Sequence, residues 1–515
     1  MNPAKTRTLN WYATGPAIVA GLAGAKLLFH LYAGRHYGYF VDELYYLACA
    51  QHLAWGYVDQ APLIAFLAKC VRLTLGDSLA AIRILPALAG AGLVLLTGFI
   101  ARELGGSRFA QGLAALAVLA APGNLSLDNL FTMNAFEPLF WMGCAFLVIR
   151  IINTENKKLW LWFGVLAGFG LENKHSMLIF GFALVVGLLL TPQRKIMASP
   201  WFWIAGALAF LIFLPNLIWN IQHHFPFLEL QANIRRSGRN VDLSPWRMFT
   251  EETLAMLPIS LPIWLGGLWY FLFTRSGRPV RALGFAFVIT AAIIMTLDPR
   301  IYYLFPAFPL LMAGGGVLLE YLLAAPRWTW LKIAYPALIA LMAVALAPLA
   351  VPVLSPPDYI RYTEAIHLQQ PRIENSALGP LPQIFADQFG WEEMTQVVAR
   401  AYNALPPDVR VKTAIFGQNY GQAGAIDFFG PKYGLPPAIS GHQSYFLWGP
   451  RGYTGESMIV MGDRQERLKE LFASVQKVGH VDHPYSMPHQ HFDVFYCTGL
   501  KQPLPELWPK LKQWD

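Results

Sequence analysis

Apolar runs long enough to cross a lipid bilayer recur along most of the chain. A spanning helix needs roughly 20 apolar residues, and about eleven segments approach or reach that length. Backbone polar groups in lipid must be satisfied within the segment itself, so the sequence predicts a polytopic α-helical membrane protein. The expected spans centre near residues 14–34, 82–101, 108–122, 134–152, 159–173, 175–191, 201–219, 253–273, 281–297, 302–323 and 328–349.

The composition agrees with this fold class. Of 515 residues, 55% are hydrophobic and 14% are charged, against roughly 25% charged in soluble domains. The net charge of +8 comes from basic residues scattered between the apolar runs, which favours positive cytoplasmic loops over nucleic-acid binding. The basic N-terminus turns apolar without an obvious cleavage site, which indicates an uncleaved anchor.

Loop charge predicts the orientation of the spans. With the N-terminus inside, every inside loop is basic, as the positive-inside rule requires. The outside loops are then residues 35–81, residues 220–252 and everything after about residue 350. The basic residues of the inside loops are Arg102, Arg108, Arg150, Lys157, Lys158, Arg194, Lys195, Arg275, Arg278, Arg281 and Arg327.

The first outside loop carries an acidic pair, Asp42 and Glu43, directly after the first span. Carboxylates at a membrane face are costly to desolvate, so they indicate a functional site. Capping of the following helix by Asp42 is the structural alternative. Two amphipathic surface helices are expected in this loop, Asp42–Trp55 and Pro62–Leu75.

The chain contains four cysteines, too few for a disulfide scaffold. Cys49 and Cys70 share the first outside loop and either pair in an oxidising compartment or stay free. Cys144 lies within an expected span, where packing explains it.

Beyond Val353 the sequence becomes polar, which divides the chain into a membrane domain, residues 1–350, and a small outer α/β domain, residues 351–515. Strands are expected at Lys412–Phe416, Ser457–Met461 and Asp493–Tyr496. A helix is expected to begin with the capping-box-like pair Asp463 and Glu466 and to run through RLKELFASV.

Three further polar clusters occur at expected span ends. Asn134 and Glu137 are three residues apart and share a helix face, although residues at a helix start around Pro138 are the alternative. Lys174 and His175 belong to the charged island Glu172–His175, where an ammonium group suits a lipid phosphate.

The third cluster, Asp298–Tyr303, contains Arg300, Tyr302 and Tyr303. Arg300 offers a guanidinium fork to a phosphate. The tyrosines are either site residues or part of an interfacial aromatic belt.

His223 and His224 are a weak metal signal without a spaced third ligand. We therefore expect no cofactor, with a divalent metal left open. The sequence has no phosphate-binding GxxxxGK[ST] loop, no GxGxxG after a strand and no HExxH.

Several motifs, in order, resemble the bacterial GT-C glycosyltransferases of the protein O-mannosyltransferase and lipid A aminoarabinose transferase (PMT-like) superfamily. They are VDELYYLACAQHLAWGYVDQAPL, TMNAFEPLFW, GLENKHS, the Pro-Gln-Arg-Lys loop and RIYYLFPAFP, within residues 10–325. The resemblance implies a GT-C fold and inverting transfer of a sugar from a polyprenyl-phosphate donor. The acceptor would be a periplasmic lipid A, polysaccharide, other envelope glycan or protein. It also implies a bacterial inner membrane location with a cytoplasmic N-terminus and a periplasmic C-terminal domain.

The same resemblance assigns roles to residues of this chain. Asp42 matches the catalytic base, Glu43 its acidic neighbour, and Glu137 lies near an acidic residue of the second outer loop. Relatives have Lys-Pro-Pro-Leu where this chain has Gln60-Ala61-Pro62-Leu63, which puts phosphate binding there in doubt. The expected donor-binding residues are Asp59, Gln60, Asn134, Lys174, His175, Arg300, Tyr302 and Tyr303.

Two other functions compete with this one. A polytopic transporter or lipid flippase would also combine many spans with buried acids, but transporters place their charges near the membrane midplane. A scaffold whose outer domain binds glycans is the second alternative.

Overall fold

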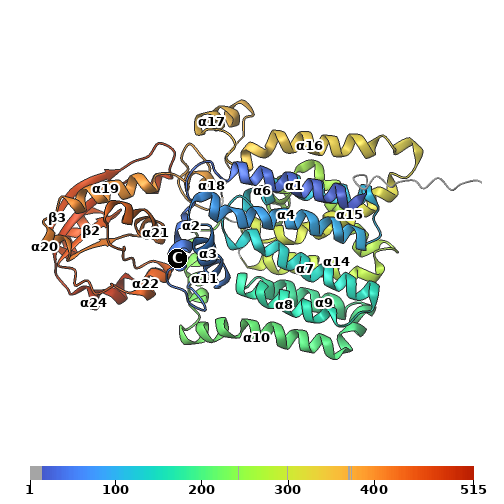
Figure 1. Ribbon diagram of the computed structural model, residues 1–515, viewed down its shortest axis with the longest axis horizontal. Helices are drawn as coiled ribbons and strands as arrows, with labels where there is room; N and C mark the ends of the chain where they lie inside the picture. Colours follow the sequence, from blue (N-terminus) through green and yellow to red (C-terminus); the bar gives the residue numbers. More distant parts are fainter. Residues whose placement is uncertain (1–13, 242, 298–299, 369, 371, 373) are drawn as a thin grey trace, which may run out of the picture. The chain divides into compact units, whose positions relative to one another are not determined.

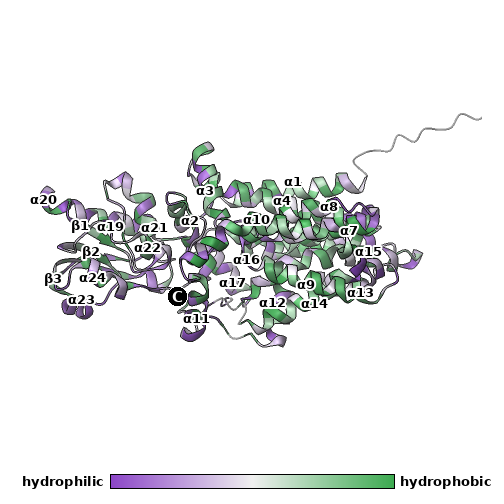
Figure 2. Cartoon of the chain, turned by 90° about the horizontal axis from the view of Figure 1, so that it is seen from below, coloured by the Kyte–Doolittle hydropathy of each residue, from purple (hydrophilic) through white to green (hydrophobic). Residues whose placement is uncertain are grey.

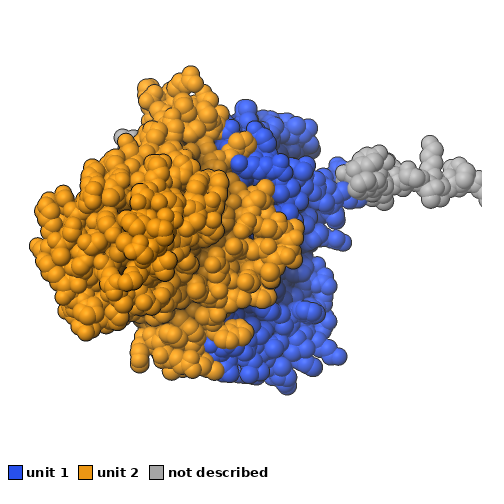
Figure 3. Space-filling view, turned by 60° about the vertical axis from the view of Figure 1, so that its left-hand side comes forward, with its two compact units in different colours: residues 1–35, 83–215, 242–353 blue, residues 36–82, 216–241, 354–515 orange. Residues whose placement is uncertain are grey.

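A computed structural model describes residues 14–241, 243–297, 300–368, 370, 372 and 374–515. The chain divides into two compact units, coloured separately in Figure 3. Unit 1 comprises residues 1–35, 83–215 and 242–353. Unit 2 comprises residues 36–82, 216–241 and 354–515. The first outside loop therefore forms one compact unit with the C-terminal region, although the sequence had grouped it with the membrane domain.

Unit 1 is helical, and its long helices run alongside one another (Figure 1). Prolines lie inside four of these helices at Pro86, Pro138, Pro215, Pro336 and Pro348. Two α-helices, α4 and α10, extend past the limits of the unit. The α-helices are α1 Gly15–Ala33, α4 Leu79–Glu103, α5 Arg108–Ala120, α6 Pro122–Leu127, α7 Met133–Thr154, α8 Leu159–Asn173, α9 Met177–Leu189, α10 Pro200–Gln222, α12 Pro245–Ala255, α13 Leu261–Phe273, α14 Arg281–Thr296, α15 Phe308–Leu322 and α16 Leu331–Ala350.

Short 3₁₀ turns connect several of these helices. They are η2 Pro192–Ala198, η3 Pro258–Ser260, η4 Arg278–Val280, η5 Ile301–Tyr303, η6 Phe305–Ala307 and η7 Pro326–Trp328.

The protein is a multi-pass membrane protein. Among the described residues, seven helical segments are long and apolar enough to cross a bilayer, or up to nine if each of two bent pairs is one span. The bent pairs are α9 with η2, at 114°, and α12 with η3 and α13, at 102°. The expected count of eleven is not confirmed, because α5 and α8 have only 13 and 15 residues.

Hydrophobic residues, coloured green in Figure 2, occur along the lengths of the helices of unit 1. The spanning windows of α10 and α16 are only 17% and 11% buried within the protein. Large side chains such as Trp203 and Ile333 are exposed there. Exposed apolar surface of this kind is stable against lipid tails.

Helices α13 and α15 pack closely through glycines. A Cβ built on Gly267 would lie 1.8 Å from the carbonyl oxygen of Leu311, and one on Gly315 would lie 1.8 Å from that of Ile263. Small residues let helix backbones meet in membranes, where van der Waals packing drives helix association.

Unit 2 combines helices with a four-stranded sheet. The helices of its earlier segments are α2 Val41–Cys49, α3 Leu63–Thr74 and α11 Pro226–Ser237. The later elements are α17 Pro356–Ala365, α18 Gln383–Ala386, α19 Trp391–Asn403, α20 Pro407–Arg410, β1 Thr413–Phe416, α21 Tyr420–Phe429, η8 Gly430–Tyr433, α22 Gln443–Trp448, β2 Ser457–Met461, α23 Gln465–Leu471, β3 Phe472–Val481, η9 Pro488–Gln490, β4 Phe492–Leu500, α24 Leu504–Leu507 and η10 Trp508–Leu511.

The strand order is β1-β2-β4-β3, with β1 and β2 parallel and the other pairs antiparallel. Strands β1 and β2 are buried along their whole length, which explains why all their residues after Thr413 and Ser457 are apolar. The three predicted strands are confirmed as β1, β2 and β4.

The helix predicted through RLKELFASV is wrong in its second half. Helix α23 ends at Leu471, and Phe472 begins β3, which pairs with β4 from Phe472 opposite Leu500. Asp463 is not the N-cap, which is Arg464. Phe472 and Val475 continue the apolar spacing of the helix, so helical periodicity alone extended it too far.

Substituting Gly267 with alanine should disrupt the packing of α13 on α15, because the added methyl group overlaps a backbone carbonyl. We expect the free energy of unfolding to fall by roughly 3 kcal/mol or more, which is at or above the usual cost of overpacking of about 1–3 kcal/mol. Gly206→Ala in α10 is the matched control, since a Cβ there meets nothing within 4 Å. The unfolding midpoint of detergent-purified protein should fall for Gly267→Ala alone. Equal midpoints for the two variants would contradict the close packing.

Candidate active site

In unit 2, Asp42 lies in the first turn of α2 and is partly buried. The hydroxyl of Tyr420, the first residue of α21, donates a hydrogen bond of 2.8 Å to Asp42 Oδ1. The two residues are 378 positions apart in the chain. A partly buried carboxylate is stabilised in its ionised form by such a donor.

Glu43, predicted as an acidic neighbour of the catalytic base, stabilises the start of α2. It is fully buried, and its Oε2 accepts a hydrogen bond of 2.8 Å from the backbone N–H of Phe40, the N-cap of α2. The alternative that Asp42 is the N-cap of this helix is therefore wrong. Glu43 satisfies the N-cap backbone, and the Asp42 carboxylate accepts from Tyr420.

Asp59 belongs to the same unit. The Tyr45 hydroxyl lies 2.9 Å from Asp59 Oδ1 and 2.8 Å from Ser444 Oγ, and Ser444 Oγ also accepts from the Val58 N–H. Burial raises the pKa of Asp59 to about 7, and the nearby charge of Asp42 adds to the rise. Two carboxylates of the first loop therefore share one tyrosine-rich polar cluster, which we call the first-loop cluster: Asp42, Tyr45, Asp59, Tyr420 and Ser444.

Gln60, predicted to bind the donor, points into the protein. It is buried, and its side-chain N–H₂ donates to Cys49 Sγ at 3.5 Å. Cys49 and Cys70 are both free thiols. The first predicted loop helix ends at Cys49 rather than Trp55, and the second is confirmed as α3.

In unit 1, Lys174 is the centre of a second cluster. Its ammonium donates to Asn134 Oδ1 at 2.9 Å and to Glu137 Oε2 at 2.8 Å. Both acceptors lie on α7, so their predicted shared helix face is confirmed. Ser176 also donates a hydrogen bond to Glu137, and the Glu137 side chain is only 3% exposed.

Two aromatic rings complete what we call the Lys174 cluster. The Lys174 ammonium lies 5.4 Å from the ring centroid of Tyr302 and 5.0 Å from that of Tyr303. Arg300 lies 3.4 Å from the Tyr302 hydroxyl. Both tyrosines are therefore cluster residues in contact with the cation. Asp298 and Pro299, also part of that predicted motif, lie outside the described residues.

His175 makes an edge contact with Phe213, with ring centroids 5.9 Å apart. Cys144 is fully buried in the core of unit 1, as its position in a span predicted. His223 stacks on Trp219 at 4.1 Å. Among the described residues, no group of three or more His, Cys, Asp or Glu side chains is arranged to hold a metal ion.

Four residues of these clusters were not predicted from the sequence: Tyr45, Ser176, Tyr420 and Ser444. Asn419 accepts from the Gln422 N–H and caps α21, so an Asn-x-x-Gln pattern signalled the helix start. No local pattern signalled that this helix packs on α2.

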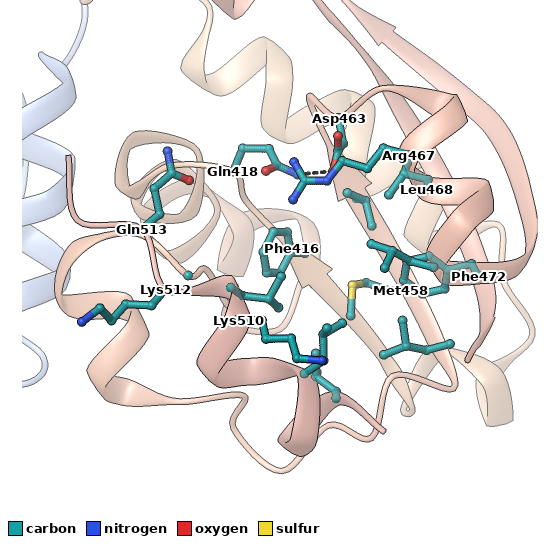
Figure 4. A pocket seen from close by; sticks show the side chains of 17 residues that line it. Phe416, Gln418, Met458, Asp463, Arg467, Leu468, Phe472, Lys510, Lys512 and Gln513 are labelled. Atoms are coloured by element: carbon teal, nitrogen blue, oxygen red, sulfur yellow. Dashed lines mark hydrogen bonds and ion pairs between the residues drawn. The ribbon is translucent and has the colours of Figure 1, made fainter. Parts of the chain in front are cut away.

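A cavity of about 240 Å³ opens elsewhere in unit 2 (Figure 4). Its walls are mainly apolar residues of β1, β2 and the helices α23 and α24, including Phe416, Met458 and Leu468. Charged residues lie at opposite ends of the cavity in Figure 4, with Asp463 and Arg467 at one end and Lys510 at the other. None of its lining residues is a predicted site residue.

Comparison with known proteins shows what this chain is similar to. The dolichyl-phosphate-mannose-protein mannosyltransferase family matches residues 59–219. Arabinofuranosyltransferase AftD from Mycobacteria has a TM-score of 0.53 at 13% identity over 93% of this chain and 40% of that chain. The expected resemblance to PMT-like GT-C glycosyltransferases is confirmed.

Two particular proteins give more detail. ArnT from Cupriavidus metallidurans, solved bound to undecaprenyl phosphate, matches with a TM-score of 0.58 at 14% identity, over 93% of this chain and 97% of that chain. The chain thus has an ArnT-like fold. The lipid A galacturonosyltransferase RgtD of Rhizobium johnstonii is 28% identical over 187 residues, which are 36% of this chain. The matched region spans 39% of the length of RgtD.

The raised pKa of Asp59 predicts a pH-dependent stability. Between about pH 4 and 7 the folded protein keeps a proton on Asp59 that the unfolded chain has released, so acidification through this window stabilises the fold. Asp59→Asn removes this dependence but keeps an acceptor for Tyr45. When the pH rises from 5.5 to 7.5, the free energy of unfolding of the wild type should fall by on the order of 1–2 kcal/mol relative to that of the variant. Unfolding midpoints measured at both pH values test this, and parallel changes in the two proteins would contradict it.

Proposed function

We propose that this protein is a membrane glycosyltransferase that moves a sugar from a polyprenyl-phosphate donor to an envelope acceptor with inversion. The observation that carries the proposal is the first-loop cluster, in which Asp42 accepts from Tyr420 and lies near a second carboxylate, Asp59. The family match over residues 59–219 and the ArnT-like fold support the same function.

Asp42 acts as the general base in this proposal. Its carboxylate takes the proton of the acceptor hydroxyl while the acceptor oxygen attacks the anomeric carbon of the donor sugar. The bond from that carbon to the phosphate oxygen breaks, and polyprenyl phosphate leaves with the electron pair. The proton remains on Asp42, and attack opposite the leaving group inverts the anomeric centre.

Lys174 binds the phosphate of the donor. Negative charge grows on the leaving phosphate oxygen, and a fixed ammonium group stabilises that charge. Asn134, Glu137 and the rings of Tyr302 and Tyr303 hold the ammonium in place before substrate binds. Arg300 adds a second cation at the same cluster.

Two predicted residues receive weaker support. Glu43 is engaged as a helix cap, so we assign it to holding α2 rather than to chemistry. Gln60 donates to Cys49 inside the protein, and it stands where relatives carry a lysine. We therefore assign it no role in binding the donor phosphate.

The proposed location is the bacterial inner membrane, with a cytoplasmic N-terminus and the C-terminal region of unit 2 in the periplasm. The basic inside loops support this orientation. RgtD is named for transfer to lipid A, which makes a lipid A-type glycolipid the first acceptor to test, ahead of polysaccharide and protein.

Replacing Asp42 with asparagine should abolish most turnover while keeping the fold, because the amide cannot accept the proton. General base catalysis contributes about 10²–10⁴-fold, so transfer should fall by that factor. Envelope lipids and glycans are compared by mass spectrometry in cells with wild type, Asp42→Asn, Asp408→Asn or no protein. The exposed Asp408 is the control and should retain wild-type glycans.

One glycan should lose a single sugar in both the Asp42→Asn and the deletion strains, while the polyprenyl-phosphate sugar accumulates. An envelope altered by deletion but normal with Asp42→Asn would overturn the catalytic assignment. That result would favour the transporter or scaffold.

The two roles of Lys174 can be separated by a double variant. Lys174→Met alone leaves Glu137 buried without its cation, which costs on the order of 3 kcal/mol. Adding Glu137→Gln should restore much of that stability without restoring a charge for phosphate. Thermal unfolding reports stability, and native mass spectrometry with undecaprenyl phosphate reports binding.

We expect the double variant to be near wild type in stability and at least tenfold weaker in lipid binding. Binding at wild-type strength by this stable variant would refute the phosphate role of Lys174.

A further inference from the structure

The region from Asn419 to Ser444, whose role the resemblance did not imply, packs against the first loop. Helix α21 lies against α2 within unit 2 (Figure 1). A backbone hydrogen bond ties the first loop to an earlier part of the C-terminal stretch, because the Val41 N–H at the start of α2 donates to the carbonyl of Asp387 at 3.1 Å.

Glycines on α21 allow the close approach. A Cβ on Gly421 would lie 2.4 Å from Val41 Cγ2, and one on Gly424 would lie 3.1 Å from the backbone carbon of Leu44. The Cβ-free face of α21 therefore brings the side chain of Tyr420 to Asp42. Bulkier residues at these two positions would hold the hydroxyl away.

The ring of Tyr420 is fixed on two sides. It stacks on His442 with centroids 5.1 Å apart and planes 7° apart, and it packs on Tyr45 at 4.7 Å. The Tyr420 N–H donates to His442 Nδ1 at 3.1 Å, so the neutral ring carries its proton on Nε2. That nitrogen lies 3.1 Å from Asp515 Oδ1, which accepts its hydrogen bond.

Hydrogen bonds from two side chains also fix Asp515. Its carbonyl oxygen accepts from Arg239 at 3.0 Å and from the Gln443 side chain at 3.0 Å. Burial lowers the pKa of His442, and the carboxylate of Asp515 opposes this shift. A continuous set of contacts therefore runs from Arg239 through Asp515 and His442 to Tyr420, and it leaves the Tyr420 hydroxyl little freedom.

We propose that Tyr420 is a positioning residue that fixes the Asp42 carboxylate for base catalysis through the hydrogen bond to Oδ1. This inference rests on the proposed function, in which Asp42 is the base. It assigns to the C-terminal region a part of the reaction: the region supplies the donor that orients the base and favours its ionised form.

Other charged and titratable groups also act on Asp42. Tyr46 lies on the same helix, and Asp59, Asp387 and Tyr420 interact with it electrostatically from other elements. Arg239 contributes charge at Tyr420 and Asp387. The Tyr420 hydroxyl donates directly to the Asp42 carboxylate, so its loss should be visible in a pH profile.

The test uses full-length protein in nanodiscs and a lipid extract from cells lacking the protein, with released polyprenyl phosphate measured by mass spectrometry. Tyr420→Phe removes only the hydroxyl. A hydrogen bond to a charged group contributes about 1.5–3 kcal/mol, so kcat should fall roughly 10- to 100-fold. We expect the KM for the lipid extract to stay within about twofold and the acid limb of the kcat profile to move to higher pH.

Tyr445→Phe is the matched control. Its hydroxyl donates to the Asp427 carboxylate at 2.9 Å in the same unit, and Tyr445 is fully buried. Its removal changes stability in a similar way but should leave both kcat and the pH profile unchanged. Equal losses of kcat in the two variants would show a general structural effect and would overturn the inference.

A second substitution covers the case in which Tyr420→Phe does not fold. 3-Fluorotyrosine at position 420 keeps the hydroxyl and makes it a stronger donor, so the acid limb should move to lower pH. An unchanged pH profile with 3-fluorotyrosine would overturn the inference.

Asp42→Asn in the same assay separates the two proposals. Loss of activity in Asp42→Asn together with wild-type behaviour in Tyr420→Phe would overturn only the role of Tyr420. Full activity in Asp42→Asn would overturn the role of Asp42 as base, on which the inference depends.

Discussion

A carboxylate that is partly removed from water needs a hydrogen-bond donor, and the Tyr420 hydroxyl supplies one to Asp42. The contacts that hold this donor in place involve all three stretches of chain that form unit 2. Three stretches of chain, residues 36–82, 216–241 and 354–515, fold together, and each contributes to the contacts that fix this pair. The first stretch supplies Asp42, the second supplies Arg239, and the third supplies Tyr420, His442 and Asp515.

In unit 1, a cation rather than a carboxylate must be stabilised, at the edge of an apolar helix bundle. Lys174 is paired with Glu137 and Asn134 and covered by two tyrosine rings. A buried pair of this kind is weak evidence for stability, because desolvation offsets much of the attraction. A pre-placed ammonium group is more readily explained by an anionic ligand, and the proposed donor phosphate is such a ligand.

The sequence predicted those features that depend on local pattern. Apolar runs and basic loops indicated the membrane helices, and spacing within one turn placed Asn134 and Glu137 on a common face. Alternating or continuous apolar residues located three strands. The prediction failed where the outcome depends on contacts distant in sequence. Glu43 and Asp42 are adjacent acids with different partners, and only the packing of α21 on α2 distinguishes them. β3 was missed because Phe472 continues the helical spacing while its backbone pairs with β4.

The most direct test of the account is a cryo-electron microscopy structure of the full protein in nanodiscs with undecaprenyl phosphate. The account predicts a phosphate oxygen within about 3 Å of the Lys174 ammonium, with the apolar tail along the helices of unit 1. It also predicts that the Tyr420 hydroxyl remains on Asp42. A phosphate bound away from Lys174, with the pair between Lys174 and Glu137 unchanged, would contradict the proposed donor site.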